Sequence, residues 1–494
     1  MDHDRKPSTD TISYHNVRSI LNDKFKNARR QMKFPSAKLC ITGIFVVLGG
    51  GFNFGFQVSI INPTGEHLQQ FLIQSLESRY VVKFSELSKR IFWSSVAGIL
   101  FFGAVIGATI IPPVINGIGS RWSFVIIGIS MIIALLLSPL SKYTNIAEFF
   151  IISRFLVGIC IGMSTTVQGV FITEISPVCY RGIMGALSGL STNIGALLAS
   201  MLGLPQIFGT NNLWPYCYLL EVISCLMFIC HAIFFLHESP LYFLKRMNEK
   251  CAKEAIKFYN PKVNYQDDDG IVRSSDEDEI EKFQVQLRNE NELKNSSWIK
   301  FWKDNGIMAM VFFGTTLLST AGFTPSGASL ANCLAGLSGT VGILVQAATI
   351  DNIGRRFLLI GSLSSLILVN FGMIILIWTY HQHSSIWLGY CFLLLFILFL
   401  FFFSVGIGPV AWFIATELTE PYSRAQVQSL SISAQYITCF LCPIFYLPLE
   451  KLIGPFSFLI FIIPLTFTTI YIYYCMPETR NRSVDEIQRL LKGE

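Results

Sequence analysis

Glu174-Ile-Ser-Pro-Val-Cys-Tyr-Arg181 and Glu417-Leu-Thr-Glu-Pro-Tyr-Ser-Arg424 are two copies of one pattern, a glutamate followed by an arginine after six residues. In each copy the glutamate ends one apolar segment and the arginine begins the next. Two more pairs of charged motifs recur in the same order, Asn116-Gly-Ile-Gly-Ser-Arg121 with Asp351-Asn-Ile-Gly-Arg-Arg356, and His237-Glu-Ser-Pro240 with Pro477-Glu-Thr-Arg480. Three motifs in one order and near-constant register indicate an internal duplication.

The composition is that of a membrane protein. Hydrophobic residues make up 52% of the 494 residues and charged residues 14%, whereas soluble domains have roughly 25% charged residues. Apolar runs long enough to cross a bilayer as helices recur along the whole chain. The expected spans are 39–60, 92–112, 123–140, 147–172, 183–204, 214–236, 306–324, 328–350, 357–379, 386–415, 427–449 and 455–475. We therefore expect an all-α membrane protein of twelve transmembrane helices in two six-helix halves.

The positions of Lys and Arg predict the orientation. Of the 37 basic residues, only Arg79, Lys83, Lys89, Arg90, Lys142 and Lys451 fall in loops opposite the two termini. Cytoplasmic loops carry an excess of these residues, so we expect both termini to be cytoplasmic. The expected division is a tail (1–38), a six-helix bundle (39–236), a linker with short helices and an acidic flexible stretch (237–305), a second bundle (306–476) and a tail (477–494).

Several classes of function are excluded. The polar, basic residues 1–38 contain no signal peptide, so the first span itself targets the membrane. The twelve cysteines lie mostly in apolar spans, which argues against a disulfide framework. The net charge of +5 reflects the cytoplasmic bias and does not indicate nucleic-acid binding. The sequence has no phosphate loop, zinc motif or nucleophile elbow, so we expect no enzyme, no cofactor and no metal site.

Charges at helix ends near a membrane are costly unless they are paired. The repeated motifs therefore predict a cytoplasmic gate network that holds the two halves together in one conformation. Breaking this network lets the halves move apart, which is alternating access. In the alternative interpretation the same pairs only fix helix packing. The predicted members are Arg154, Glu174, Arg181, Glu238, Asp351, Arg355, Arg356, Glu417 and Arg424.

These motifs resemble those of the sugar porters of the major facilitator superfamily, nearest the facilitative hexose transporters. The resemblance covers about residues 45–480. The segments that carry it are Leu48–Asn62, Arg154-Phe-Leu-Val-Gly158, Glu174–Gly182, Glu238-Ser-Pro240, Asp351–Arg356, Gly406-Ile-Gly-Pro409 with Trp412, and Pro477–Arg482. It implies a transporter in which Gly406, Gly408 and Pro409 let the tenth helix bend.

The positions that resemblance assigns to sugar binding have diverged. Gly189 stands where the family has a sugar-binding glutamine, and the family's seventh-helix motif is absent. Trp412 retains an aromatic face and Gln435 retains an amide, the groups that bind sugar rings and hydroxyls. The predicted substrate-binding residues are Trp412, Gln435, Thr316, Ser319, Asn193 and Ser404.

Two residues inside the spans bear on energy coupling. Gln57 stands where proton-coupled members of the family carry an aspartate, and an amide does not titrate. We therefore expect uniport. Glu221 lies within the sixth span, where an isolated carboxylate marks a functional site by default. It is protonated, faces the solute pathway, or extends outward to water.

The sequence thus predicts a plasma-membrane carrier, embedded in the lipid bilayer, that moves a hexose such as glucose down its gradient. The small-molecule solute, a monosaccharide, is the expected partner, no nucleic acid is expected, and a homo-oligomer is allowed. One alternative is a porter of another small polar solute, such as a polyol or an organic acid. The other is a sugar sensor that transports poorly.

Overall fold

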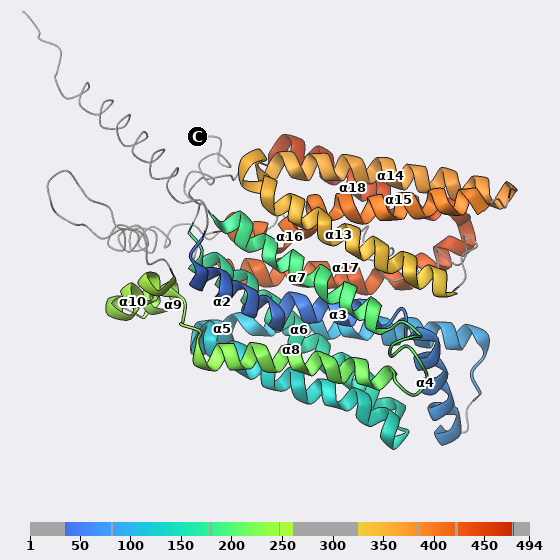
Figure 1. Ribbon diagram of the computed structural model, residues 1–494, viewed down its shortest axis with the longest axis horizontal. Coiled ribbons are helices and arrows are strands. Elements are labelled where there is room, and N and C mark those ends of the chain that lie inside the picture. Colours follow the sequence, from blue (N-terminus) through green and yellow to red (C-terminus); the bar gives the residue numbers. More distant parts are fainter. Residues whose placement is uncertain are drawn as a thin grey trace, which may run out of the picture.

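The computed structural model describes residues 35–80, 83–177, 180–246, 248–259, 325–383, 386–419, 423–476 and 478. Within these ranges the chain is helical, and its long helices run side by side in two groups (Figure 1). The N-terminal half contains α2 (Ala37–Val47), η1 (Leu48–Phe52), α3 (Asn53–Ile60), α4 (Gly65–Tyr80), α5 (Glu86–Thr144), α6 (Ala147–Ile175), α7 (Arg181–Leu202), α8 (Trp214–Phe234), α9 (Pro240–Lys245) and α10 (Glu249–Tyr259).

The C-terminal half contains α13 (Pro325–Ile353), α14 (Arg355–His383), α15 (Ile386–Val405), α16 (Ile407–Glu417), α17 (Arg424–Ile453), η4 (Gly454–Phe458) and α18 (Leu459–Cys475). The expected span 306–324 lies outside the described residues. The halves meet along a seam where α7 packs against α13 and α17 packs against α5. We call the end of the molecule that carries α10 the α10 end and the opposite end the α4 end (Figure 1).

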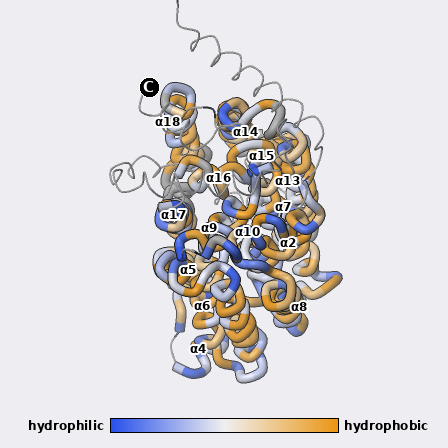
Figure 2. Tube along the Cα trace, turned by 90° about the vertical axis from the view of Figure 1, so that its left-hand side faces the viewer, coloured by the Kyte–Doolittle hydropathy of each residue, from blue (hydrophilic) through white to orange (hydrophobic). Residues whose placement is uncertain are grey.

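Among the described residues, nine helices are long and apolar enough to cross a membrane. One of them, Ser88–Thr144, is 57 residues long and contains two of the expected spans. Hydrophobic residues cover the helical rods, and hydrophilic residues gather towards the helix ends (Figure 2). The helices satisfy their own backbone polar groups, as a bilayer requires, and present apolar side chains to it. The predicted all-α architecture is confirmed.

Helix α5 is two spans joined at Gly119. This glycine has φ 86° and ψ 172°, a conformation outside the helical region. A side chain is strained at such a φ, whereas glycine adopts it freely. The chain therefore turns back at Gly119 without a loop, and the second span starts with the N–H groups of the next residues free to be capped.

The first span is not a regular helix. The triple glycine at its centre forms the π-helical turn η1 between α2 and α3. Such turns free backbone groups from the regular ladder. Two side chains one turn apart on α6 bond to this segment: the Ser164 hydroxyl donates to the carbonyl of Gly49 at 2.8 Å, and the N–H of Gly51 donates to Gln168 Oε1 at 2.9 Å. The irregular turn is thus held by the neighbouring helix.

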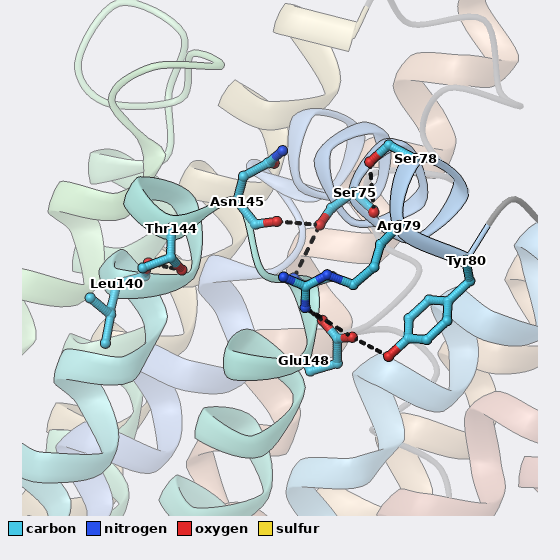
Figure 3. A network of polar contacts seen from close by, with 9 residues as sticks. Ser75, Ser78, Arg79, Tyr80, Leu140, Thr144, Asn145 and Glu148 are labelled. Carbon is cyan, nitrogen blue, oxygen red and sulfur yellow. Dashed lines mark hydrogen bonds and ion pairs between the residues drawn. The ribbon is translucent and has the colours of Figure 1, made fainter.

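At the α4 end, helix α4 is joined to the turn between α5 and α6 by polar contacts (Figure 3). Ser75 donates to the carbonyl of Asn145 at 2.8 Å and accepts from the first N–H of α6 at 3.2 Å. The residue that precedes α6 is an isoleucine, which cannot cap a helix, so Ser75 supplies the missing acceptor. Tyr80 donates to Glu148 at 2.7 Å, and Arg79 lies 3.4 Å from the same carboxylate.

Candidate functional site

The two copies of the repeated motif meet across the seam. Thr173 and Thr416 directly precede the two glutamates, and their hydroxyl oxygens lie 2.7 Å apart. Residues at equivalent positions of a duplication contact each other in this way on the pseudo-two-fold axis between the halves. The carboxylate of Glu174 is acted on by the charge of Arg424 from the other half, and Ser239 hydrogen-bonds to it. The expected gathering of Glu174 and Arg424 is therefore observed at the α10 end.

Other members of the predicted gate network make contacts within their own half or lack a described side chain. The guanidinium of Arg181 donates to the carbonyl of Ser176 at 3.3 Å. The side chains of Asp351 and Glu417 are outside the described part of the structure. Their roles therefore stay predictions.

Glu238 caps the helix that begins after Gly119. Its two carboxylate oxygens accept from the N–H groups of Ser120 and Arg121, each at 2.9 Å. A Cβ atom on Gly119 would lie 2.3 Å from Glu238 Oε2, so only glycine leaves room for the carboxylate. Burial raises the pKa of Glu238, while the N–H groups of Ser239, Arg121 and Ser120 lower it.

The C-terminal half repeats this cap. The carboxylate of Glu478 accepts from the N–H groups of Arg355 at 2.9 Å and Arg356 at 3.1 Å. Gly354, with φ 104°, takes the place of Gly119, and a Cβ atom there would lie 2.6 Å from Glu478. The guanidinium of Arg356 donates to the carbonyl of Tyr473, a residue of the same half. These hydrogen bonds stabilise helix ends within each half, so they support the packing interpretation for these motifs.

Arg154 does not belong to the α10-end cluster, and that prediction is wrong. It lies seven residues after the start of α6, whereas Glu174 ends the same helix, roughly 30 Å away at 1.5 Å per residue. Arg154 is fully buried. Its Nη1 donates to Gln57 Oε1 at 2.7 Å and to the Gln57 carbonyl at 3.0 Å. The RxxxG pattern alone did not reveal which end of the span carried the arginine's partners.

Glu221 completes this buried cluster. Gln57 Nε2 donates to Glu221 Oε2 at 2.5 Å, so one amide contacts the arginine through its oxygen and the glutamate through its nitrogen. Glu221 is only 1% exposed, which excludes the expectation that it extends outward to water. Burying a cation without a compensating anion costs on the order of several kcal/mol of folding free energy. Glu221, on a different helix, is the acidic side chain whose charge acts on Arg154, with Gln57 between the two.

Aromatic side chains cover this cluster towards the α4 end. Trp214 and Tyr218, one turn apart on α8, both pack edge-on against Phe150, with ring centroids 5.8 and 5.7 Å away. Phe71 of α4 packs against Trp214 at 5.7 Å. All four rings are buried. The charged cluster is thus closed off from the α4 end in this conformation.

Trp412 lies in an aromatic group to which both halves contribute. The ring of Phe54, from the first span, meets Trp412 edge-on with centroids 5.4 Å apart and lies 5.5 Å from Tyr436. The hydroxyl of Tyr436 is 3.0 Å from that of Thr165 on α6. Sequence reasoning did not identify Phe54, Thr165 or Tyr436 as site residues. Aromatic faces beside hydroxyl groups form the kind of surface that binds sugar rings.

Two other predicted substrate contacts converge elsewhere on the seam. A Cβ atom on Gly339 of α13 would lie 2.8 Å from Asn193 Oδ1 and 3.1 Å from Ser404 Oγ. Asn193 belongs to α7 of one half and Ser404 to α15 of the other, so Gly339 lets both approach the same point. Gln435 is half-buried on α17 beside Tyr436. Thr316 and Ser319 lie outside the described residues.

Gly189 does not face an open pocket. A Cβ atom there would lie 2.7 Å from Pro409, and one on Gly185, a turn earlier, would lie 2.3 Å from Phe413. Two small residues four apart on α7 therefore receive two side chains of α16, as in small-residue contacts between membrane helices. The space that a glutamine at position 189 would occupy is filled by Pro409.

The bend predicted in the tenth span is present. Gly406, with φ −130° and ψ −87°, interrupts the helix between α15 and α16. A Cβ atom on Gly406 would lie 2.1 Å from Ser362 Oγ, and one on Gly408 would lie 2.5 Å from Phe403. Pro409 follows in the first turn of α16, where its missing N–H costs nothing.

No group of three or more His, Cys, Asp or Glu side chains that could hold a metal ion occurs in the described ranges. The contacts described at the seam are hydrogen bonds, aromatic contacts and charge interactions.

Comparisons with known proteins agree over nearly the whole chain. The family described as "Sugar (and other) transporter" matches residues 42–491. Solute carrier family 2, facilitated glucose transporter member 3 of Ovis aries is 27% identical over 464 residues, covering 92% of this chain and 93% of that protein. Member 5 of Rattus norvegicus is 24% identical over 475 residues, covering 92% and 91%.

Solved structures share the fold. The proton:xylose symporter XylE bound to 6-bromo-6-deoxy-D-glucose superposes with a TM-score of 0.80 at 17% identity, covering 93% of this chain and all of that one. At that identity the likeness shows the fold alone, which is that of the major facilitator superfamily. Since the family match spans the chain from the first helix to the C-terminal segment, this protein belongs to the family of sugar and other transporters and is an integral membrane carrier, not an enzyme.

Proposed function

We propose that this protein is a facilitative carrier, a uniporter, that moves a hexose such as glucose by alternating access. The observation that carries the proposal is the aromatic group around Trp412, because both halves contribute to it and a solute bound there is released when the halves part. The relatives named as facilitated glucose transporters support the hexose. The divergence at Gly189 and in the seventh span leaves fewer amide contacts, so we expect low affinity.

The α10 end is the cytoplasmic end in this proposal, and the membrane is the plasma membrane. The excess of Lys and Arg in the termini, the central segment 237–305 and the loops on that side supports the assignment. Two bundles, 39–236 and 306–476, then move relative to each other around the solute. A monosaccharide and the bilayer are the partners, and a homo-oligomer is compatible with the exposed helical surfaces.

The gate network consists of Glu174, Arg181, Glu417 and Arg424 in this proposal. The charge of Arg424 acts on Glu174 across the seam, and the neighbouring Thr173–Thr416 contact joins the same helix ends. Opening the α10 end requires these interactions to break. Charged contacts suit this purpose because hydration of both groups, which are desolvated in the closed state, offsets the lost attraction when the end opens.

The buried cluster supports uniport. Gln57 cannot release a proton, and its amide bonds to Arg154 on one side and to Glu221 on the other. A compensated arginine also weakens the alternative of an organic-acid porter, since no unbalanced positive charge remains in this cluster to attract an anion. Trp412 and Tyr436 favour an uncharged ring-shaped solute over a linear polyol.

Uptake of labelled D-glucose into proteoliposomes tests the proposal, with L-glucose as the control for leak. We expect saturable, stereoselective uptake that is lost in Trp412→Ala and kept in Trp387→Ala, a tryptophan that is 78% exposed on the outer surface of α15. Transport of a polyol but not of D-glucose would show that the substrate is a polyol and not a hexose. Binding of D-glucose without any flux would support the alternative of a sugar sensor that transports poorly.

A further inference from the structure

One face of α6 forms a row of uncharged contacts with the other half. The residues at positions 165, 169 and 173 are each four apart, so they lie on one side of the helix. Their counterparts in the C-terminal half are Tyr436 opposite Thr165 at 3.0 Å, Gln428 opposite Gly169, and Thr416 opposite Thr173 at 2.7 Å. The row runs from the aromatic group around Trp412 to the α10 end.

The middle contact is an amide placed against a glycine. Gln428 is 1% exposed, and a Cβ atom on Gly169 would lie 2.5 Å from its Nε2 and 3.1 Å from its Cδ. Any side chain at position 169 would therefore displace the Gln428 amide. Glycine at position 169 therefore lets the two halves approach at this level with the Gln428 amide in its observed position.

The same amide also holds Trp412. Gln428 Nε2 donates to the backbone carbonyl of Trp412 at 2.9 Å, joining α17 to α16. Its Oε1 is buried without a hydrogen-bond partner. Gln428 thus donates a hydrogen bond to Trp412, the candidate solute residue, and also packs against Gly169 of the opposite half. A buried acceptor without a partner is stabilised by water once the halves separate.

We propose that Gln428 is a positioning residue of the solute site, which holds Trp412 in its binding position while the Gly169 contact closes the α10 end. Closure and the position of Trp412 are then linked through one side chain. This inference rests on the proposed function only for the identity of the solute, because closure of the α10 end can be measured without any sugar. No charged group is needed for this link, which distinguishes it from the Glu174–Arg424 gate.

Three variants separate positioning from packing. Gln428→Ala removes the donor to Trp412 but leaves the space over Gly169 free. Gly169→Ala places a methyl group against the Gln428 amide, and we expect it to hold the halves apart. The double variant Gly169→Ala/Gln428→Ala removes the clash and the donor together. The matched control is Gly361→Ala, a helical glycine of α14 with nothing within 4 Å of the added methyl group.

Closure is measured by the distance between spin labels at Gly117→Cys and Phe357→Cys, in a background in which the native cysteines are replaced. Both positions lie near the α10 end, one in each half, and both are exposed. We expect longer distances in Gly169→Ala and parental distances in Gln428→Ala, in the double variant and in the control. Double-variant distances as long as those of Gly169→Ala would overturn the packing role of Gln428.

Positioning is measured by the KM for external D-glucose. We expect Gln428→Ala and the double variant to raise KM about fivefold with kcat within twofold, the factor for ~1 kcal/mol of one lost hydrogen bond. If Gln428 acted only in packing, KM would change only in the variants whose spin-label distances change. An unchanged KM in Gln428→Ala would overturn the proposal.

If the protein does not carry D-glucose, the positioning of Trp412 is measured instead by the hydrogen-exchange rate of the α16 segment 407–417. Gln428→Ala should then speed exchange in that segment, and Gly361→Ala should not. Equal exchange in Gln428→Ala and parent would overturn the proposal independently of the solute.

Discussion

If Glu221 is the anion that compensates Arg154, replacing it with glutamine removes one negative charge from the buried cluster and almost nothing else. The new side chain has the same shape, and its oxygen can still accept from Gln57 Nε2, which donates to Glu221 at 2.5 Å in the parent. Arg154 remains fully buried and keeps its two hydrogen bonds to Gln57. The variant therefore measures what the charge of Glu221 contributes to holding Arg154 inside the helical bundle.

The size of the effect follows from the burial. Removing one partner of a buried ion pair costs about 3–5 kcal/mol, because the other charge is left uncompensated. Gln57 still bonds to Arg154, so we place the cost at the low end, about 3 kcal/mol. For cooperative units of about 200 residues each kcal/mol shifts the melting temperature by about 2–4 °C, which gives a loss of roughly 6–12 °C.

The assay is thermal unfolding in detergent, followed with a thiol-reactive fluorophore. Cys160, Cys217 and Cys225 are buried, so their reaction reports loss of packing without engineered cysteines. The control is Glu148→Gln, in the same half.

The Glu148 pair with Arg79, at 3.4 Å, is partly exposed, with 31% and 43% of the two side chains accessible. Such surface pairs contribute ~1 kcal/mol or less. The control variant should therefore melt close to the parent.

A paired neutralisation completes the test. In Arg154→Met/Glu221→Gln no uncompensated charge remains, so we expect the double variant to be more stable than the sum of the two single effects predicts, by about 1 kcal/mol or more. If Glu221→Gln melts within 2 °C of the parent, or the two effects add, Glu221 does not compensate Arg154 and the interpretation of the cluster fails.

The other predictions concern coupling, the α4 end and the helix caps. An imposed pH gradient should leave the initial rate of D-glucose uptake by the parent unchanged, because Gln57 does not titrate. The same gradient should alter the rate in Gln57→Asp. Uptake by the parent that is driven by the gradient would contradict uniport. Ser75→Ala should cost ~1 kcal/mol at the start of α6 and speed hydrogen exchange there, whereas Ser78→Ala, whose hydroxyl bonds within its own helix, should not; equal exchange in both would refute the cap. Glu238→Ala should lower the melting temperature by several degrees through about 2 kcal/mol of lost capping, and a parental melting temperature would show that water replaces the carboxylate.

The helical architecture followed from the sequence because bilayer crossing requires long apolar runs, and these runs are visible without any tertiary information. The duplicated motifs predicted that Glu174 and the Arg424 region lie together at one end, and the structure places them there. The bend at Gly406 followed from its glycine and the nearby Pro409. Each of these signals is local, so no knowledge of packing was needed.

Positions that depend on packing between distant helices could not be predicted. Arg154 was assigned to the wrong end because the sequence gives its span but not its partners, which come from the first and sixth spans. The closing of the space at Gly189 by Pro409 likewise depends on the approach of α16. A usable signal did exist, since Arg154 and Glu221 are opposite charges inside spans, where an uncompensated charge is too costly to leave alone.

The most direct test of the central claim is counterflow. Proteoliposomes loaded with unlabelled D-glucose are diluted into a trace of labelled D-glucose, and internal label is followed over time. A carrier with one alternately exposed site returns loaded, so the label should rise above its equilibrium level and then fall, with D-glucose and not with L-glucose. A monotonic approach to equilibrium, the same for both sugars, would contradict a hexose uniporter that works by alternating access.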